Sequence, residues 1–215
     1  MILYDGKGNQ IASIDGDKPF AGKKWVVLGD SISKTNHSPM PYHAVISEKL
    51  GFTVENLAVG GITWEYVRDT EVPLISDDAA LITIMAGTND WTLYTNMSAG
   101  DADDTVSDGT YSGLVHDTLL AIQSRFPTIP VGVITPVYRA IEAGNATIRS
   151  ISQTIKAVCE YNSVPCLDLN SGSGVLGFTA ENIAYYYNDT GIHPNNNGQA
   201  VMAAKIEPFI RSLMP

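Results

Sequence analysis

The chain has 215 residues and a formal net charge of −10, from 13 Lys+Arg against 23 Asp+Glu. This length suits one domain with a single core, and a composition that is 44% hydrophobic and 17% charged is typical of a globular protein. The acidic charge argues against nucleic acid and anionic membrane surfaces as partners, and no apolar run approaches the ~20 residues that span a bilayer.

Residues 1–22 are expected to form an N-terminal appendage to a domain at 23–215. The apolar runs Ile2–Tyr4 and Ile11–Ile14 flank a glycine-rich turn signal, which predicts a β-hairpin or the tail of a preceding domain in a larger protein. The first residues lack the long apolar core of a signal peptide. The compartment therefore stays open: cytoplasmic, or secreted or surface-bound as part of a larger chain.

From Trp25 onward, apolar runs alternate with helical patterns. The runs predict buried strands at Trp25–Leu28, Val54–Ala58, Ala80–Met85, Val131–Ile134 and Val164–Leu169. The helical patterns cover Ser38–Leu50, with Ser38 as N-cap and Gly51 as stop, then Val115–Phe126, Ile148–Val158 and Ala203–Leu213, the last with a kink at Pro208. This alternation predicts an α/β fold with a five-stranded parallel sheet covered by helices on both faces.

Two cysteines, Cys159 and Cys166, fall in a predicted helix and in the strand after it. We expect two buried thiols rather than a disulfide, because free cysteines are among the most buried residues. Neither lies in a Cys-x-x-Cys pair, so no metal site and no cofactor are expected.

Polar residues follow the predicted strands, where the carboxyl ends of a parallel sheet gather into one crevice. Gly29-Asp30-Ser31 follows the first strand, Gly60-Gly61 the second and Gly87-Thr88-Asn89-Asp90 the third, while His193 lies in a loop before the last helix. Ser31 suits a nucleophile and His193 a general base, and Asn89 suits an oxyanion donor on a loop that Asp90 holds. Each of the three strand-end blocks, taken alone, is more typical of a simple turn.

The four blocks in this order resemble the SGNH hydrolase family, also called GDSL esterases and lipases, over residues 23 to about 213. The resemblance implies a flavodoxin-like three-layer α/β/α sandwich. It also implies that Ser31 is the nucleophile and His193 its base, with the oxyanion hole formed by the N–H groups of Ser31 and Gly61 and by the Asn89 side chain.

The chain departs from the family pattern at the acid. The family usually reads Asp-x-x-His, whereas Thr190 stands three residues before His193 and Asp189 stands four before it. We expect Asp189 to complete a catalytic triad through a bulge in this glycine-containing loop. The alternative is a Ser31–His193 dyad.

Four residues near these blocks are candidates for substrate contact: Trp64, Trp91, Tyr138 and Arg139. Aromatic side chains in such loops either stack on a sugar ring or pack against the core.

The hypothesis is a serine esterase for small acyl esters, acetyl esters of carbohydrate above all, whose partner is a small-molecule or glycan ester. A lysophospholipase or thioesterase with a longer acyl preference is the alternative enzyme. A non-catalytic carbohydrate-binding or tail-associated domain, part of a larger chain or assembly, is the alternative outside enzymes.

Overall fold

The computed structural model describes residues 2–4, 10–13, 18–34, 38–140, 145–188 and 191–214. Its main element is a five-stranded sheet with the order β4-β3-β5-β6-β7, in which every neighbouring pair is parallel. The strands are β3 (Lys24–Gly29), β4 (Thr53–Asn56), β5 (Ala79–Met85), β6 (Val131–Ile134) and β7 (Cys166–Leu167). The predicted fold class is confirmed.

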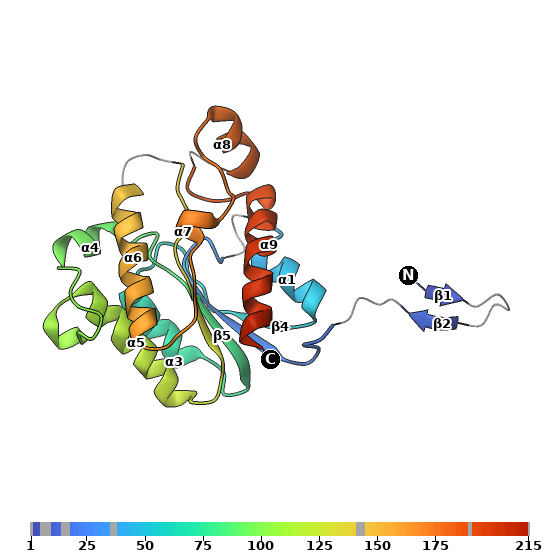
Figure 1. Ribbon diagram of the computed structural model, residues 1–215, viewed down its shortest axis with the longest axis horizontal. Helices are drawn as coiled ribbons and strands as arrows, with labels where there is room; N and C mark the ends of the chain where they lie inside the picture. The colour runs from blue at the N-terminus through green and yellow to red at the C-terminus, as the bar shows by residue number, and fades with distance from the viewer. Residues whose placement is uncertain are drawn as a thin grey trace.

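Helices cover both faces of this sheet (Figure 1). The longer ones are α1 (Tyr42–Leu50), α5 (Tyr111–Arg125), α6 (Asn145–Tyr161) and α9 (Asn196–Leu213). The short ones are α2 (Trp64–Tyr66), the π-helical turn η2 (Val67–Glu71), α3 (Val72–Leu74), α4 (Trp91–Asn96), the 3₁₀ turn η3 (Val106–Asp108), α7 (Leu169–Gly172) and α8 (Ala180–Tyr186).

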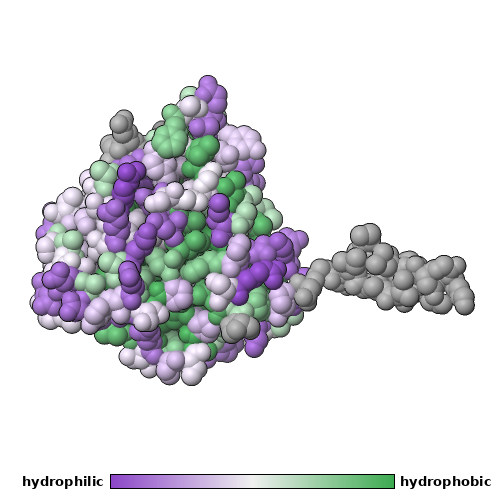
Figure 2. All heavy atoms as spheres, in the orientation of Figure 1, coloured by the Kyte–Doolittle hydropathy of each residue, from purple (hydrophilic) through white to green (hydrophobic). Residues whose placement is uncertain are grey.

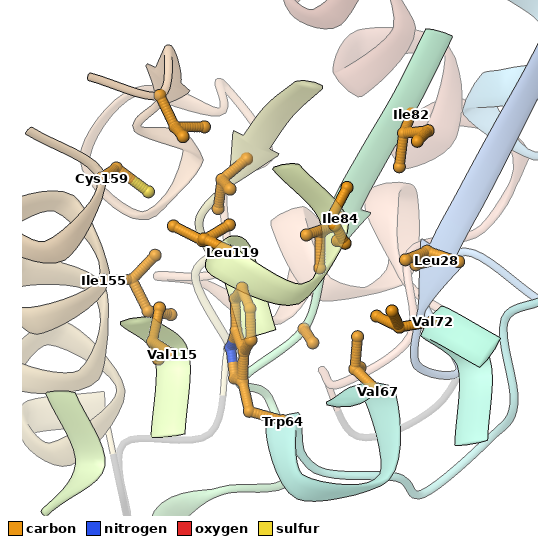
Figure 3. Close-up of a cluster of buried hydrophobic side chains, with 14 of the residues drawn as sticks. Leu28, Trp64, Val67, Val72, Ile82, Ile84, Val115, Leu119, Ile155 and Cys159 are labelled. Atoms are coloured by element: carbon orange, nitrogen blue, oxygen red, sulfur yellow. The ribbon is translucent and has the colours of Figure 1, made fainter. Parts of the chain in front are cut away.

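The core forms two layers, because successive side chains of a strand point to opposite faces. On β3, Val26 and Leu28 pack toward α5 and α6, whereas Trp25 and Val27 pack toward α1 and α9. Figure 3 shows the first of these layers, in which the indole of Trp64 lies among buried aliphatic side chains. The sheet is therefore fixed from both sides, and the strand ends that carry the polar blocks are fixed with it.

Two short N-terminal strands, β1 (Ile2–Tyr4) and β2 (Gln10–Ser13), pair antiparallel in a separate sheet, in the arrangement of the predicted hairpin. Phe20 also falls in the segment assigned to the appendage, yet its ring stacks on Phe52 with centroids 4.8 Å apart. The backbone N–H of Phe20 donates to the carbonyl of Leu50 at 3.0 Å. Packing onto the main domain therefore begins before residue 23.

Helix α1 begins later than predicted. Pro41, rather than Ser38, is its N-cap, with an extended backbone (φ −65°, ψ 156°). The proline disfavours a helical conformation at Met40, so no helix can form across this pair. The predicted stop is confirmed, since Gly51 caps the helix in the left-handed conformation with φ 89°.

Strand β7 is shorter than the predicted Val164–Leu169. Pro165 has no N–H to donate, although its carbonyl still accepts from Val133 at 3.0 Å. At the other end, the carboxylate of Asp168 accepts the N–H of Ser171 at 3.0 Å and begins α7. The last strand is thus limited by a proline before it and a helix cap after it.

On the face drawn in Figure 2, hydrophobic residues lie in the centre and hydrophilic ones gather toward the margins. In the part of the chain that the structure describes, no helix combines the length and apolarity needed to cross a membrane. Cys159 is buried, Cys166 is half-buried, and both are free thiols.

Candidate active site

Ser31 lies in the turn directly after β3, where the chain leaves the sheet. A side chain at Gly29 would place its Cβ 2.3 Å from the carbonyl oxygen of Met85, so only glycine allows β3 to end so close to β5. Asp30 is buried, and its carboxylate accepts the N–H of Ile32 at 2.9 Å, which holds the turn. The Ser31 hydroxyl is thereby placed at the carboxyl edge of the sheet.

His193 approaches this hydroxyl from the other end of the sequence. Its Nε2 lies 3.0 Å from Oγ of Ser31. The loop is closed by two backbone hydrogen bonds, from Asn188 N–H to the His193 carbonyl at 3.0 Å and from Asn195 N–H to the Tyr186 carbonyl at 2.8 Å. A ring nitrogen at this distance from a serine hydroxyl is in reach of its proton.

Gly61 and Asn89 lie at the same cleft as Ser31. The Asn89 Nδ2 donates to the carbonyl of Ile62 at 2.9 Å, which fixes the amide and leaves its second N–H for another acceptor. Gly61 has φ +81°, a conformation that side-chain-bearing residues rarely adopt. Among the described residues, no protein group accepts the backbone N–H of Ser31 or of Gly61, so both remain available to a ligand.

The cleft has a volume of about 320 Å³ and is lined by residues from all four predicted blocks. Its lining comprises Ser31, Gly60, Gly61, Thr88, Asn89, Trp91, Arg139, Ile192 and His193. The structure thus brings Ser31, Gly61, Asn89 and His193 together. Asp189 falls outside the described residues, so its part in the site stays a prediction.

The four candidates for substrate contact differ in position. Trp91 and Arg139 line the catalytic cleft, and the Trp91 side chain is 53% exposed. Trp64 has no exposed surface and packs in the core beside α5 (Figure 3), which is the second of the two alternatives for these aromatic side chains and excludes it as a substrate contact. Tyr138 lines a neighbouring pocket of about 390 Å³, where its ring lies 5.3 Å from that of Phe178.

Of the remaining histidines in the described residues, His43 and His116 are packing residues. His43 Nε2 lies 2.9 Å from the carbonyl of Ser33, and burial lowers the pKa of this imidazole. His116 Nδ1 lies 2.9 Å from the side-chain nitrogen of Asn162.

Gln199 links the helix after the His193 loop to the backbone beside Ser31, and no sequence motif predicts this role. This buried side chain of α9 donates from Nε2 to the carbonyl of Ile32 at 3.0 Å, and its Oε1 accepts the N–H of Tyr42 at 2.8 Å. The helix that follows the His193 loop is therefore tied to the turn of Ser31. Both partners are backbone groups, which no residue pattern can indicate.

Three carboxyl groups lie buried beneath the catalytic loops: Asp30, Glu71 and Asp90. Glu71 accepts the N–H of Gly29 at 2.9 Å, and Asp90 accepts the N–H of Trp64 at 3.0 Å, as predicted for a residue that holds its loop. Burial raises the pKa of all three, to about 8 for Glu71 and to about 7 for Asp90. Each carboxyl group therefore accepts at least one N–H of a catalytic loop, and with a pKa of about 8 Glu71 is largely neutral at pH 7.

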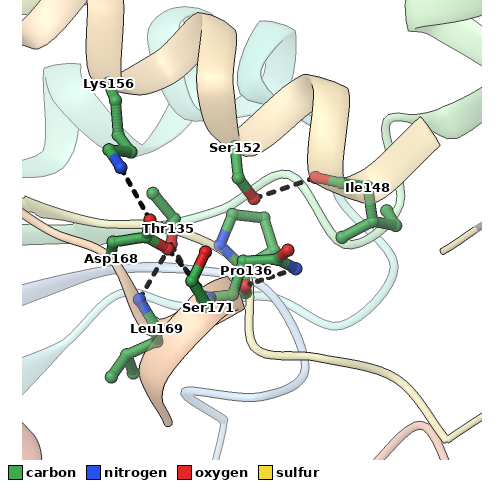
Figure 4. A network of polar contacts seen from close by, with 9 residues as sticks. Thr135, Pro136, Ile148, Ser152, Lys156, Asp168, Leu169 and Ser171 are labelled. Carbon is green, nitrogen blue, oxygen red and sulfur yellow. Dashed lines mark hydrogen bonds and ion pairs between the residues drawn. The ribbon is translucent and has the colours of Figure 1, made fainter. Parts of the chain in front are cut away.

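A polar network anchors the loop after β6 (Figure 4). The Thr135 hydroxyl donates to Asp168 at 3.3 Å and accepts the N–H of Leu169 at 3.0 Å. Lys156 of α6 forms an ion pair with Asp168 at 2.7 Å. This network fixes the start of the segment that leads to Arg139.

Comparison with known proteins places this sequence in a family of hydrolases. A model of the GDSL-like Lipase/Acylhydrolase family matches residues 27–201. No protein of curated function matches the chain. Among solved structures, a protein from Lactobacillus plantarum has 25% identity and a TM-score of 0.76, covering 89% of this chain and 98% of its own.

Two further structures carry functional descriptions. One is a possible lipase from Chitinophaga pinensis, with 19% identity and a TM-score of 0.70, covering 88% of this chain and 98% of its own. The other is an acetyl xylan esterase from Geobacillus stearothermophilus, with 18% identity and a TM-score of 0.62, covering 90% of this chain and 95% of its own. At these identities the likeness is one of fold.

Proposed function

The chain belongs to the GDSL-like lipase/acylhydrolase family and is a serine hydrolase of the SGNH type, and on this premise we propose that it hydrolyses small acyl esters, in particular acetyl esters of carbohydrate. The observation that carries the proposal is the 3.0 Å contact between Oγ of Ser31 and Nε2 of His193 at the wall of the cleft. A serine hydroxyl at its ordinary pKa is a weak nucleophile and needs such a base.

In the proposed reaction, His193 takes the proton of Ser31 while Oγ attacks the ester carbonyl carbon. The carbonyl oxygen becomes an oxyanion, which accepts hydrogen bonds from the N–H groups of Ser31 and Gly61 and from the Asn89 amide. The C–O bond to the alcohol then breaks, and His193 returns the proton to the leaving oxygen. Water, deprotonated by the same imidazole, attacks the acyl-enzyme and regenerates Ser31.

We assign Asp189 the task of orienting the His193 imidazole, as the acid of a triad. A carboxylate at the second ring nitrogen selects the tautomer that can accept the serine proton and stabilises the imidazolium that follows. The dyad remains the alternative, and substitution of Asp189 separates the two.

The dimensions of the cleft support a small acyl group. Its volume of about 320 Å³ is at the lower end of the ~300–1,000 Å³ range of ligand pockets. Trp91 and Ile192 are the large apolar side chains in its lining, and Trp91 offers an exposed ring for stacking on a sugar. The shared fold with an acetyl xylan esterase is consistent with an acetyl ester of a carbohydrate.

A series of p-nitrophenyl esters from acetate to palmitate tests this proposal. The rate constant kcat/KM is expected to be highest for acetate or propionate and to fall as the acyl chain lengthens. Ser31→Ala should abolish turnover, while Ser212→Ala, an exposed serine of α9, should leave it unchanged. A maximum at eight carbons or more, or turnover that survives Ser31→Ala, would contradict it.

A further inference from the structure

We propose that Arg139 forms an anion subsite within the catalytic cleft, which binds a carboxylate carried by the ester substrate. This inference rests on the proposed function and extends it to the charge of the substrate. Arg139 lines the cleft together with Ser31 and His193. A group bound there is therefore close enough to belong to the molecule whose ester bond is broken.

The backbone of Arg139 is held in place from two sides. Its carbonyl accepts a hydrogen bond from the Asn145 side chain at 2.6 Å, at the start of α6. The next residue, Ala140, donates its N–H to the carbonyl of Gly191 at 2.7 Å, in the loop of His193. The guanidinium thus extends from a fixed point between α6 and the loop of the catalytic base, which lowers the cost of ordering it on a ligand.

The guanidinium itself lacks a partner within the described residues. No hydrogen bond or ion pair of its side chain is found there, and its Nε is enclosed yet donates to nothing. In contrast, Arg68, Arg125 and Arg211 each form an ion pair with a carboxylate. A guanidinium whose N–H groups the protein does not use gains charge-assisted hydrogen bonds when a ligand in the cleft accepts from them.

A carboxylate is the acceptor that fits this arginine best. The planar guanidinium offers parallel N–H groups that match the two oxygens of a carboxylate. The chain as a whole has a net charge of −10 and repels polyanions, so a single cation in the cleft suits a substrate with one negative group near the ester. That carboxylate lies either on the alcohol, as in an acidic sugar, or at the far end of the acyl group.

Two pairs of matched esters distinguish these sources. For the alcohol side, p-acetoxybenzoate is compared with its methyl ester. For the acyl side, mono-p-nitrophenyl adipate is compared with p-nitrophenyl hexanoate. In at least one pair, Arg139→Gln should lower kcat/KM for the anionic ester about tenfold or more relative to the neutral one, mainly through KM.

Two further variants serve as controls. Arg139→Lys should retain part of the preference for the anionic ester, because lysine keeps the positive charge but lacks the parallel N–H groups of the guanidinium. Arg211→Gln removes the same charge from the last turn of α9, where Arg211 pairs with Glu207, and should leave the anionic-to-neutral ratio unchanged. An equal effect of Arg139→Gln and Arg211→Gln would overturn the subsite.

A binding measurement separates this inference from the proposed function. In a Ser31→Ala protein, the anionic ester of the pair that responds to Arg139→Gln should bind more tightly than its neutral counterpart by calorimetry, and the double substitution with Arg139→Gln should remove the difference. The subsite is refuted if, in both pairs, the anionic and neutral esters bind equally to the Ser31→Ala protein and Arg139→Gln leaves the ratio of their kcat/KM values unchanged. Hydrolysis of p-nitrophenyl acetate by the unmodified protein, and its loss in Ser31→Ala, shows in that case that the esterase itself stands.

Discussion

Replacement of Gln199 by methionine tests whether the turn of Ser31 depends on the helix that follows His193. The substitution keeps the length of the side chain and removes both of its hydrogen bonds, to the Ile32 carbonyl and the Tyr42 N–H. Two buried backbone groups are then left unpaired, at about 1–3 kcal/mol each. We expect a loss of about 3 kcal/mol in the free energy of unfolding, or roughly 6–12 °C in Tm for a domain of this size.

Activity should fall as well, because Ile32 is the residue after the proposed nucleophile. A small displacement of a reacting atom lowers the rate strongly, so we expect kcat to fall by about tenfold while KM changes little. The assay is p-nitrophenyl acetate hydrolysis at a temperature where thermal melts show the variant to be folded.

A second variant, Gln199→Glu, keeps the acceptor for Tyr42 but can donate to Ile32 only when its carboxyl is protonated. Its destabilisation should therefore be smaller at about pH 5 than at about pH 8. The matched control is Gln153→Met on the exposed face of α6, which should stay within about 0.5 kcal/mol of the unmodified protein. Wild-type Tm and kcat in Gln199→Met would refute the reasoning.

Three other substitutions address the site, two at proposed catalytic groups and one at the buried Glu71. Asn89→Ala should lower kcat by about 10²–10³-fold with little change in KM, because it removes one oxyanion donor; a loss below about threefold would exclude that role. Asp189→Asn should lower kcat/KM by orders of magnitude in a triad, since a wrong histidine tautomer costs ~10⁴-fold in the serine protease template, whereas a change under about tenfold indicates the dyad. In the unmodified protein, Glu71 keeps its proton in the folded state between about pH 4.5 and pH 8 but loses it in the unfolded state, so the free energy of unfolding falls as the pH rises through this window. Glu71→Gln has no such proton, so its stability should rise relative to that of the unmodified protein across the same window. Thermal melts of both proteins at about pH 5 and pH 8 measure that difference, and equal shifts in the two would contradict a buried, protonated Glu71.

Local sequence patterns were enough to predict the layers of the fold. The apolar runs at Trp25–Leu28 and Val131–Ile134 lie in β3 and β6, because a strand buried on both faces has to be apolar throughout. The element ends were harder to predict. At Pro41 and Asp168, the boundary was set by a proline and by a side-chain cap rather than by hydrophobicity.

The site was predictable where its residues follow strands in recognisable blocks. Ser31, Gly61 and Asn89 gather at one cleft because parallel strands end at the same edge of the sheet, and the loop between α8 and α9 brings His193 to them. Gln199 could not be predicted, since its partners are backbone groups 157 and 167 positions away. Trp64 follows a block as Trp91 does, and its burial depends on tertiary packing that the local sequence does not show.

The most direct test of the central claim is the mass of the intact protein after reaction with a fluorophosphonate, followed by peptide mapping of the adduct. We predict a single adduct on Ser31 that is absent from Ser31→Ala and greatly slowed in His193→Ala. No adduct on the folded protein, or an adduct on another serine, would contradict the assignment of Ser31 as the nucleophile.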